Sequence, residues 1–258
     1  MAIEDYRFDG ETTLVTGSTR GIGAEIARQF GRLGASVVVT GLPDQAELGE
    51  RVAESISGTD GEATFVPADL SEVGGVEALL EGATSAFGDI DYVVNNAAVI
   101  TTTSPRDCSI ADWESLMAIN LRAYWLVARD ALAHGNGGTV TNVSSIHAAA
   151  TLPGAFPYNV SKSAVAGLTR SLAVDLGPEI RVNSVEPGQV VVERNESIVA
   201  EQSDDVARIY PLERIGDPLD VASVVAFLAS DAAAFVTGVN LPVDGGLHSL
   251  QAAYGDQP

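Results

Sequence analysis

Residues 12–33 read TTLVTGSTRGIGAEIARQFGRL. The first five are mostly β-branched and favour a strand, whereas further on Ile26, Phe30 and Leu33 fall on one face of a helix. A glycine-rich loop, residues 17–23, joins the two. In a strand–loop–helix unit of this kind, free backbone N–H groups and the positive end of the helix meet where a pyrophosphate can bind. The stretch therefore predicts an α/β fold with a nucleotide site at its first turn.

Three glycines in this loop have separate steric tasks. Gly17 permits the sharp turn after the strand, Gly21 lets the backbone approach a phosphate, and Gly23 lets the helix pack on the sheet. Their spacing is G-x-x-x-G-x-G rather than the G-x-G-x-x-G of the dinucleotide fingerprint. The position of the loop, after the first strand and before an amphipathic helix, favours a nucleotide site over a simple turn.

The rest of the chain alternates β-favouring and amphipathic segments. Predicted strands cover residues 12–16, 36–40, 63–67, 91–95, 139–143, 181–185 and 239–243, and predicted helices cover 24–33, 45–57, 72–87, 110–118, 121–133, 157–176 and 218–229. This alternation predicts a Rossmann-type, doubly wound parallel sheet of about seven strands, with helices on both faces. We expect one domain over residues 1–258, with the polar segment 189–210 as a substrate lid.

Composition limits the class of protein. The chain has 258 residues, 46% hydrophobic and 19% charged, so it is long enough to bury a large core. Its net charge of −21 argues against nucleic acid or an anionic membrane as a partner, because phosphate groups need a basic surface. No apolar run reaches the about 18 residues of a membrane span, and residues 1–10 do not resemble a signal peptide. A single cysteine, Cys108, fits a reducing compartment, so a cytoplasmic protein is expected.

Lys162 is the only lysine among the 14 basic residues; the others are arginine. An acidic excess combined with the loss of lysine resembles the proteins of extreme halophiles, in which concentrated salt screens the repulsion between carboxylates. Lysine carries a compact charge whose pKa can be tuned, while arginine stays charged. The one position that retains lysine is therefore a candidate for chemistry. Tyr158 precedes it by one helical turn, so the two side chains are neighbours on a helix.

Several motifs follow the glycine loop in order. They are Asn95-Asn96-Ala97-Ala98, Asn142-Val143-Ser144-Ser145, Tyr158-x-x-x-Lys162, Pro187-Gly188, residues 211–216 (PLERIG) and residues 243–246 (VDGG). No single motif is unique to one family, but the ordered set is specific. From about Leu14 to Gly246 the chain resembles the short-chain dehydrogenase/reductase family. The resemblance implies an NAD(P)-dependent oxidoreductase that interconverts a carbonyl and a secondary alcohol by hydride transfer.

The resemblance implies four catalytic residues. Tyr158 transfers a proton to or from the substrate oxygen, and Lys162 lowers the pKa of the tyrosine and binds the nicotinamide ribose. Ser145 hydrogen-bonds the carbonyl on which charge develops, and Asn120 holds a water of the proton relay. A positive charge about 4 Å away, at an effective dielectric of about 20, is worth about 4 kcal/mol. That is enough to lower the pKa of a tyrosine from about 10 to about 7.

The resemblance also implies a set of cofactor contacts. They are Gly17, Thr19, Arg20, Gly21, Ile22, Gly23, Gly41, Asp69, Leu70, Asn96, Ala97, Ala98, Tyr158, Lys162, Pro187, Gly188 and Val190. At the end of the second strand, Gly41 offers no carboxylate to a ribose 2′-OH, and Arg20 can meet a 2′-phosphate. These two residues favour NADP(H) over NAD(H), although Asp44 lies close enough in the chain to reach back.

Substrate contacts are predicted at Ser145, His147 and Gln189. The pattern resembles both 3-oxoacyl thioester reductases, which we favour, and sugar or polyol dehydrogenases; a non-catalytic nucleotide-binding regulator is the alternative of another class. The three histidines lack metal-ligand spacing, so no metal site is predicted. Relatives usually form tetramers through two long helices and the C-terminal strand, so a homotetramer acting on a small carbonyl or alcohol is expected.

Three positions depart from the family pattern. Ala98 replaces a usual glycine, and Val192 stands where a threonine often binds the cofactor. Glu186 precedes Pro187, where small residues are usual. We expect the Glu186 side chain to face away from the substrate, in a structural hydrogen bond.

Overall fold

The computed structural model describes residues 6–132, 137–151, 153–193 and 206–250. Seven strands form one sheet in the order β3-β2-β1-β4-β5-β6-β7, with parallel pairing between each pair of neighbours. Their bounds are β1 Thr12–Val15, β2 Ser36–Gly41, β3 Glu62–Pro67, β4 Tyr92–Asn95, β5 Gly138–Val143, β6 Ile180–Pro187 and β7 Asn240–Val243. The predicted doubly wound parallel sheet is confirmed.

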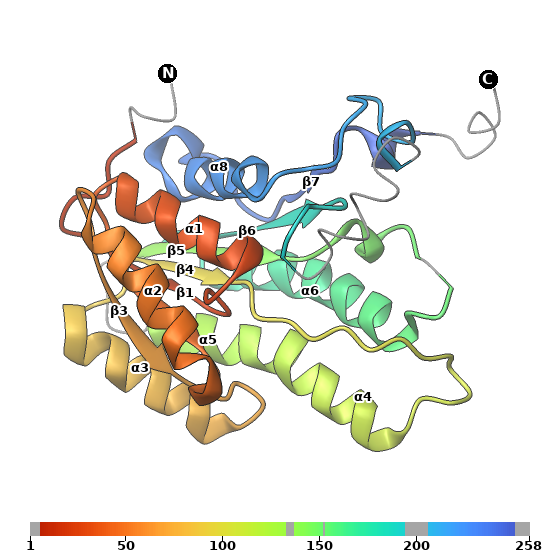
Figure 1. Cartoon of the computed structure of the whole chain (residues 1–258), viewed down its shortest axis with the longest axis horizontal. Coiled ribbons are helices and arrows are strands. Elements are labelled where there is room, and N and C mark those ends of the chain that lie inside the picture. Colours follow the sequence, from red (N-terminus) through yellow and green to blue (C-terminus); the bar gives the residue numbers. More distant parts are fainter. Residues whose placement is uncertain (1–5, 133–136, 152, 194–205, 251–258) are drawn as a thin grey trace.

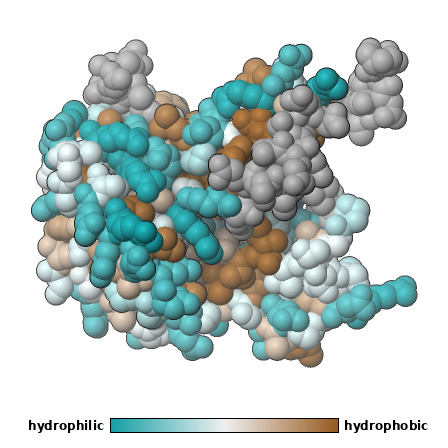
Figure 2. Space-filling view, viewed as in Figure 1, coloured by the Kyte–Doolittle hydropathy of each residue, from teal (hydrophilic) through white to brown (hydrophobic). Residues whose placement is uncertain are grey.

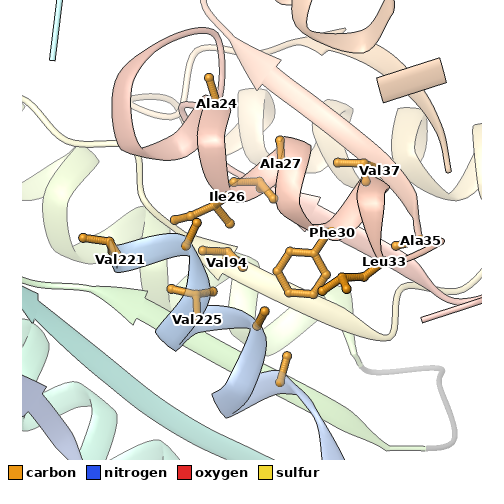
Figure 3. Packing of buried hydrophobic residues seen from close by; sticks show 14 of the residues in the cluster. Ala24, Ile26, Ala27, Phe30, Leu33, Ala35, Val37, Val94, Val221 and Val225 are labelled. Carbon is orange, nitrogen blue, oxygen red and sulfur yellow. The ribbon is translucent and has the colours of Figure 1, made fainter. Parts of the chain in front are cut away.

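Helices cover both faces of this sheet (Figure 1). One layer holds α1 Gly21–Arg32, α2 Ala46–Ser57 and α8 Pro218–Ala229, and the other holds α3 Val73–Phe87, α5 Ala123–Ala131 and α6 Phe156–Asp175, with α4 Ile110–Met117 leading into α5. Two apolar cores result, one on each face. In the first, Phe30 of α1 and Val225 of α8 pack with Val94 of the sheet (Figure 3). Burial on both sides explains why β2 is a continuous valine-rich run.

The strand order reverses at β1. The chain runs from β1 outward to β2 and β3, then returns to the other side of β1, where β4 pairs through Leu14↔Val93. The two halves thus wind away from each other between β1 and β4. In open parallel sheets, ligands bind at this switch point, beyond the carboxyl ends of the strands. The glycine loop after β1 opens directly onto it.

A π turn, Ala118–Arg122, joins α4 to α5, and the N–H of Ala123 donates to the carbonyl of Ala118. Helical structure therefore continues from Ile110 to Ala131. Both predicted helices are present, as α4 and α5, but no loop separates them, because no glycine or proline interrupts this stretch and the extra residue is absorbed by the wider turn. The π turn places Asn120 in the interior.

The predicted lid falls partly on residues 194–205, which lie outside the described residues. Its first residues are held in place, because Gly216 donates to the Gln189 carbonyl at 3.0 Å and accepts from the Val191 N–H at 2.9 Å. The Tyr210 hydroxyl accepts the Gln189 N–H at 3.1 Å. Within the described part of the chain, no helix is both long and apolar enough to cross a membrane.

Candidate active site

The end of β4 fixes the shape of the glycine loop. Asn96 donates through Nδ2 to the carbonyls of Thr16 and Gly17, at 3.0 and 2.9 Å. Gly17 has a φ of +63°, and a Cβ there would lie 2.7 Å from the Ala97 Cα. A Cβ on Gly23 would lie 2.4 Å from the Gly17 carbonyl oxygen. Side chains at these two glycines would fill the loop, which is why the chain has none there.

The N-terminus of α1 is built to receive an anion. Its N-cap, Arg20, makes no side-chain capping hydrogen bond, and the first turn has no acidic residue. The backbone N–H groups of that turn are thus left for a ligand, on the positive end of the helix. Thr19 is buried, and Ile22 packs against the core. The loop therefore fits a dinucleotide pyrophosphate.

At the end of β2, Gly41 is closely surrounded. A Cβ there would lie 2.5 Å from Thr19 Cγ2 and 2.7 Å from Gln45 Oε1. The Thr19 hydroxyl donates to that Gln45 oxygen at 3.0 Å, which fixes both neighbours. No acidic side chain fits at position 41 without moving this pair. Arg20 and Asp44 are both exposed beside it.

The other predicted cofactor residues lie at strand ends along the same edge of the sheet. Those at the turns after β3, β4 and β6 are Asp69, Leu70, Ala98, Pro187, Gly188 and Val190. Asp69 is exposed and accepts the Ser71 N–H at 2.9 Å, whereas Leu70 is buried. Gly188 donates to the Val243 carbonyl at 3.1 Å. This edge brings together residues from the whole length of the chain.

Ser145 lies two residues after β5 and is the N-cap of a short 3-10 turn, Ile146–Ala148. Its buried hydroxyl accepts the His147 N–H at 3.2 Å, so the hydroxyl proton can be donated to a substrate oxygen. The His147 ring stands edge-on to the Tyr158 ring with centroids 6.1 Å apart, and Nδ1 lies 3.0 Å from the Ala150 carbonyl. The predicted substrate residue His147 is thus beside Tyr158, and Ser145 begins the same turn.

Lys162 is 2% exposed, and its ammonium donates to the Val143 carbonyl at 2.8 Å. The ammonium also lies 5.7 Å from the centre of the Tyr158 ring. Burial lowers the pKa of Lys162 to about 7. This agrees with the expectation that the pKa of a lysine can be tuned by its surroundings, whereas an arginine would stay charged.

The side chain of Asn120 clamps the segment after β4. It accepts the Val99 N–H and donates to the Val99 carbonyl, both at 2.9 Å, and donates to Ser161 Oγ at 3.1 Å. Both amide hydrogens are used in this way, and a relay water held by Asn120 stays a prediction. The sequence did not indicate this clamp.

Glu186 is 5% exposed at the end of β6, and no hydrogen bond reaches its carboxylate from the described residues. The expected structural hydrogen bond is therefore not found. Burial raises the pKa of Glu186, while His248 and Arg170 act in the opposite direction. Among the described residues, no group of three potential ligands is arranged to hold a metal ion.

Comparison with known proteins gives matches over nearly the whole chain. The family model described as Enoyl-(Acyl carrier protein) reductase matches residues 17–248. Versicolorin reductase of Emericella nidulans is 36% identical, over 94% of this chain and 97% of that protein. The solved angucycline C-6 ketoreductase LanV with bound NADP is 32% identical, with a TM-score of 0.88 over 95% and 98% of the two chains. A short-chain dehydrogenase/reductase named as a glucose/ribitol dehydrogenase, from Brucella melitensis, is 32% identical, with a TM-score of 0.87 over 94% and 98%.

Proposed function

We propose, from the premise that this chain belongs to the short-chain dehydrogenase/reductase family and is an NAD(P)-dependent oxidoreductase, that it interconverts a carbonyl and a secondary alcohol. One observation carries the proposal. The buried ammonium of Lys162 lies 5.7 Å from the centre of the Tyr158 ring and donates to the carbonyl of Val143, which ends β5 two residues before Ser145. A tunable cation, a phenol and a hydroxyl donor are the groups that proton transfer to a carbonyl oxygen requires.

The chain's own residues handle the proton. When bound, the nicotinamide cofactor supplies or accepts the hydride. In the reductive direction, Ser145 donates a hydrogen bond to the carbonyl oxygen and Tyr158 gives that oxygen its proton. In the oxidative direction, Tyr158 takes the proton from the alcohol. The charge on Lys162 stabilises the phenolate form, and it acts strongly because burial keeps water away from it.

Exposed apolar side chains after β4 support an apolar substrate. Val99, whose backbone Asn120 clamps, and Ile100 are 37% and 47% exposed. In the same orientation as Figure 1, the molecule carries a hydrophobic area in the middle of the face, next to the polar surface of α1 and α2 (Figure 2). A sugar or polyol needs convergent polar groups in its pocket. We therefore favour a 3-oxoacyl thioester or a similar apolar ketone over a sugar.

A substrate panel in multimolar KCl tests both the proposed reaction and the proposed substrate class. Reduced-cofactor absorbance is followed with 3-oxoacyl thioesters, apolar ketones, sugars and polyols, and the Tyr158→Phe variant is the negative control. Turnover of apolar ketones well above that of sugars is expected. A marked preference for sugars would overturn the substrate class, and no turnover of any carbonyl or alcohol would overturn the reaction. Loss of the fold in salt-free buffer would support the halophilic reading of the composition.

The region around Gly41 and Arg20 supports NADP(H) as the preferred cofactor. Replacing Arg20 with alanine is expected to weaken NADP(H) binding by about 10–100-fold, because a hydrogen bond between charged groups contributes about 1.5–3 kcal/mol. Binding of NAD(H) is expected to change little. Dissociation constants for both cofactors, measured by fluorescence titration, check this.

Arg28→Ala provides the matched control. Arg28 also lies on α1, but its guanidinium faces Glu25 and Ser55, away from the loop. If wild-type protein binds NAD(H) more tightly than NADP(H), the preference is wrong, whatever the effect of the Arg20 change.

The outer face of the α4–α5 and α6 helices supports assembly into a homo-oligomer, with a tetramer as the expected state. An open groove there is lined by Trp113, Met117, Leu121, Trp125, Gly167 and Leu168. Two tryptophans on one open surface are typical of an interface. A second copy of the chain would bury them.

Replacing Gly167 with arginine should break this assembly. A Cβ at Gly167 meets nothing within 4 Å, so the isolated chain tolerates the change, but a long arginine side chain would occupy the groove, which Glu114 and Arg122 line together with the apolar residues. The molar mass by light scattering in high salt is expected to fall at least by half. Gly74→Arg on α3 is the control, because its Cβ position is equally open. A monomeric wild-type protein would contradict the proposal.

A further inference from the structure

Tyr124 is a buried tyrosine that the sequence did not mark as functional. It lies at the start of α5 and is 1% exposed. Its backbone carbonyl accepts from Asn95 Nδ2 at 3.1 Å, and its hydroxyl donates to the Val143 carbonyl at 3.2 Å. The position of the phenol is therefore fixed from both ends, by β4 and by β5.

The Tyr124 hydroxyl shares the Val143 carbonyl with Lys162. The ammonium of Lys162 lies 2.8 Å from that carbonyl oxygen and 3.5 Å from the Tyr124 hydroxyl. Because the phenol proton is directed to Val143, its oxygen lone pairs are available to the ammonium. The ammonium also lies 5.4 Å from the centre of the Tyr124 ring and 5.7 Å from that of Tyr158, within the range of cation–π attraction.

A neutral acceptor suits this place better than a carboxylate. Among the described residues, no acidic side chain pairs with Lys162. A carboxylate here would hold the ammonium but would also cancel its effect on Tyr158. Burial raises the pKa of Tyr124, with a smaller contribution from Tyr158, so the phenol stays neutral. It can therefore hold the cation while leaving its full charge to act on the neighbouring tyrosine.

We propose that Tyr124 is a positioning residue that holds the ammonium of Lys162 against the Val143 carbonyl and favours its charged form. This role rests on the proposed function, since it acts through Lys162 on Tyr158. Without the Tyr124 hydroxyl, the charged form of Lys162 loses an acceptor. The phenolate of Tyr158 then loses part of its stabilisation, and proton transfer from an alcohol requires a higher pH.

Tyr124→Phe tests this proposal, because phenylalanine keeps the ring and removes the hydroxyl. For alcohol oxidation, kcat/KM near neutral pH is expected to fall about 10–100-fold, the range for a lost hydrogen bond to a charged group. The rise of activity with pH is expected to move to higher pH. In the cofactor-free protein, the ultraviolet absorbance of tyrosinate, taken as a difference from Tyr158→Phe, is expected to show Tyr158 ionising at higher pH as well.

Tyr92→Phe is the matched control. It removes another tyrosine hydroxyl, hydrogen-bonded to Glu11 at 2.8 Å, on the same sheet but away from Lys162. It should lower stability without moving either pH curve. If Tyr124→Phe gives the wild-type curves while Tyr158→Phe abolishes turnover, the proposal is overturned and the function stands. If the wild-type protein turns over no carbonyl or alcohol, the function fails, and the cofactor-free titration alone decides the role of Tyr124.

Discussion

A Tyr158→Phe variant is expected to lose about 10²–10⁴-fold in kcat, the range for a general acid or base. The change removes one oxygen atom from a half-buried ring that lies between His147 and Lys162. The other tyrosine near Lys162, Tyr124, directs its hydroxyl proton to the Val143 carbonyl. The hydride can still be delivered, but the oxygen that must gain or lose a proton has no partner with a suitable pKa.

Three measurements separate this effect from a loss of structure. Circular dichroism and the melting temperature are expected to stay near those of the wild type, since the ring remains. The dissociation constant of the cofactor is expected to change by only a few-fold. Steady-state kcat, measured across pH, then shows whether proton transfer depends on Tyr158. A variant that retains more than about a tenth of wild-type kcat would remove Tyr158 from its proposed role, since even the weakest general acids and bases contribute about 10²-fold.

Replacing Lys162 with methionine should abolish turnover and at the same time stabilise the fold. The pKa of Lys162 falls from its usual 10.5 to about 7 because the group is buried. At about 1.36 kcal/mol per pH unit, this corresponds to a penalty on the order of 5 kcal/mol as an upper bound. Methionine has a similar length and no charge to bury. The variant is therefore expected to be inactive and to have a larger free energy of unfolding than the wild type.

The stability difference between the methionine variant and the wild type is expected to depend on pH. Below pH 7, Lys162 is charged in the folded and unfolded chain, and burial of the charge opposes folding in full. Between about pH 7 and 10.5 the folded chain binds fewer protons than the unfolded chain, so wild-type stability rises with pH through this window. The advantage of the methionine variant should thus be largest below pH 7 and shrink toward zero near pH 10.5.

Denaturant unfolding in high KCl, with and without cofactor, measures this difference. The cofactor-free proteins should show the full effect. A methionine variant that is less stable than the wild type at pH 6 would mean that the hydrogen bond to Val143 and the two tyrosine rings outweigh the burial penalty. In that case the lysine would be a structural residue as well.

The fold was predictable because its signals are local. Segments with the hydrophobic periodicity of strands and of helices alternate along the chain, and the glycine loop after β1 indicates the nucleotide site. The π turn was missed because residues 118–122 have the same apolar pattern as the helices on either side. A turn wider by one residue leaves no mark in composition.

The site was predictable in identity but not in environment. Motif spacing singles out Lys162, yet the depth of its burial depends on β5 and α5 packing around it. In the sequence, Tyr124 looks like one more apolar residue of a helix. Its hydroxyl has a polar role because the fold places the Val143 carbonyl within hydrogen-bond distance. Glu186 was expected to find a partner, because the sequence gives no measure of what surrounds the end of β6.

The π turn also sets the directions in which the side chains of α5 point. In an α-helix each residue advances the side-chain direction by about 100°. One residue taken up in the wider turn therefore turns the whole of α5 by that angle relative to α4. In this phase Tyr124 faces Val143, while the next residue, Trp125, faces outward into the groove. A single extra residue thus sets which ring of α5 meets the buried ammonium and which is presented to another molecule.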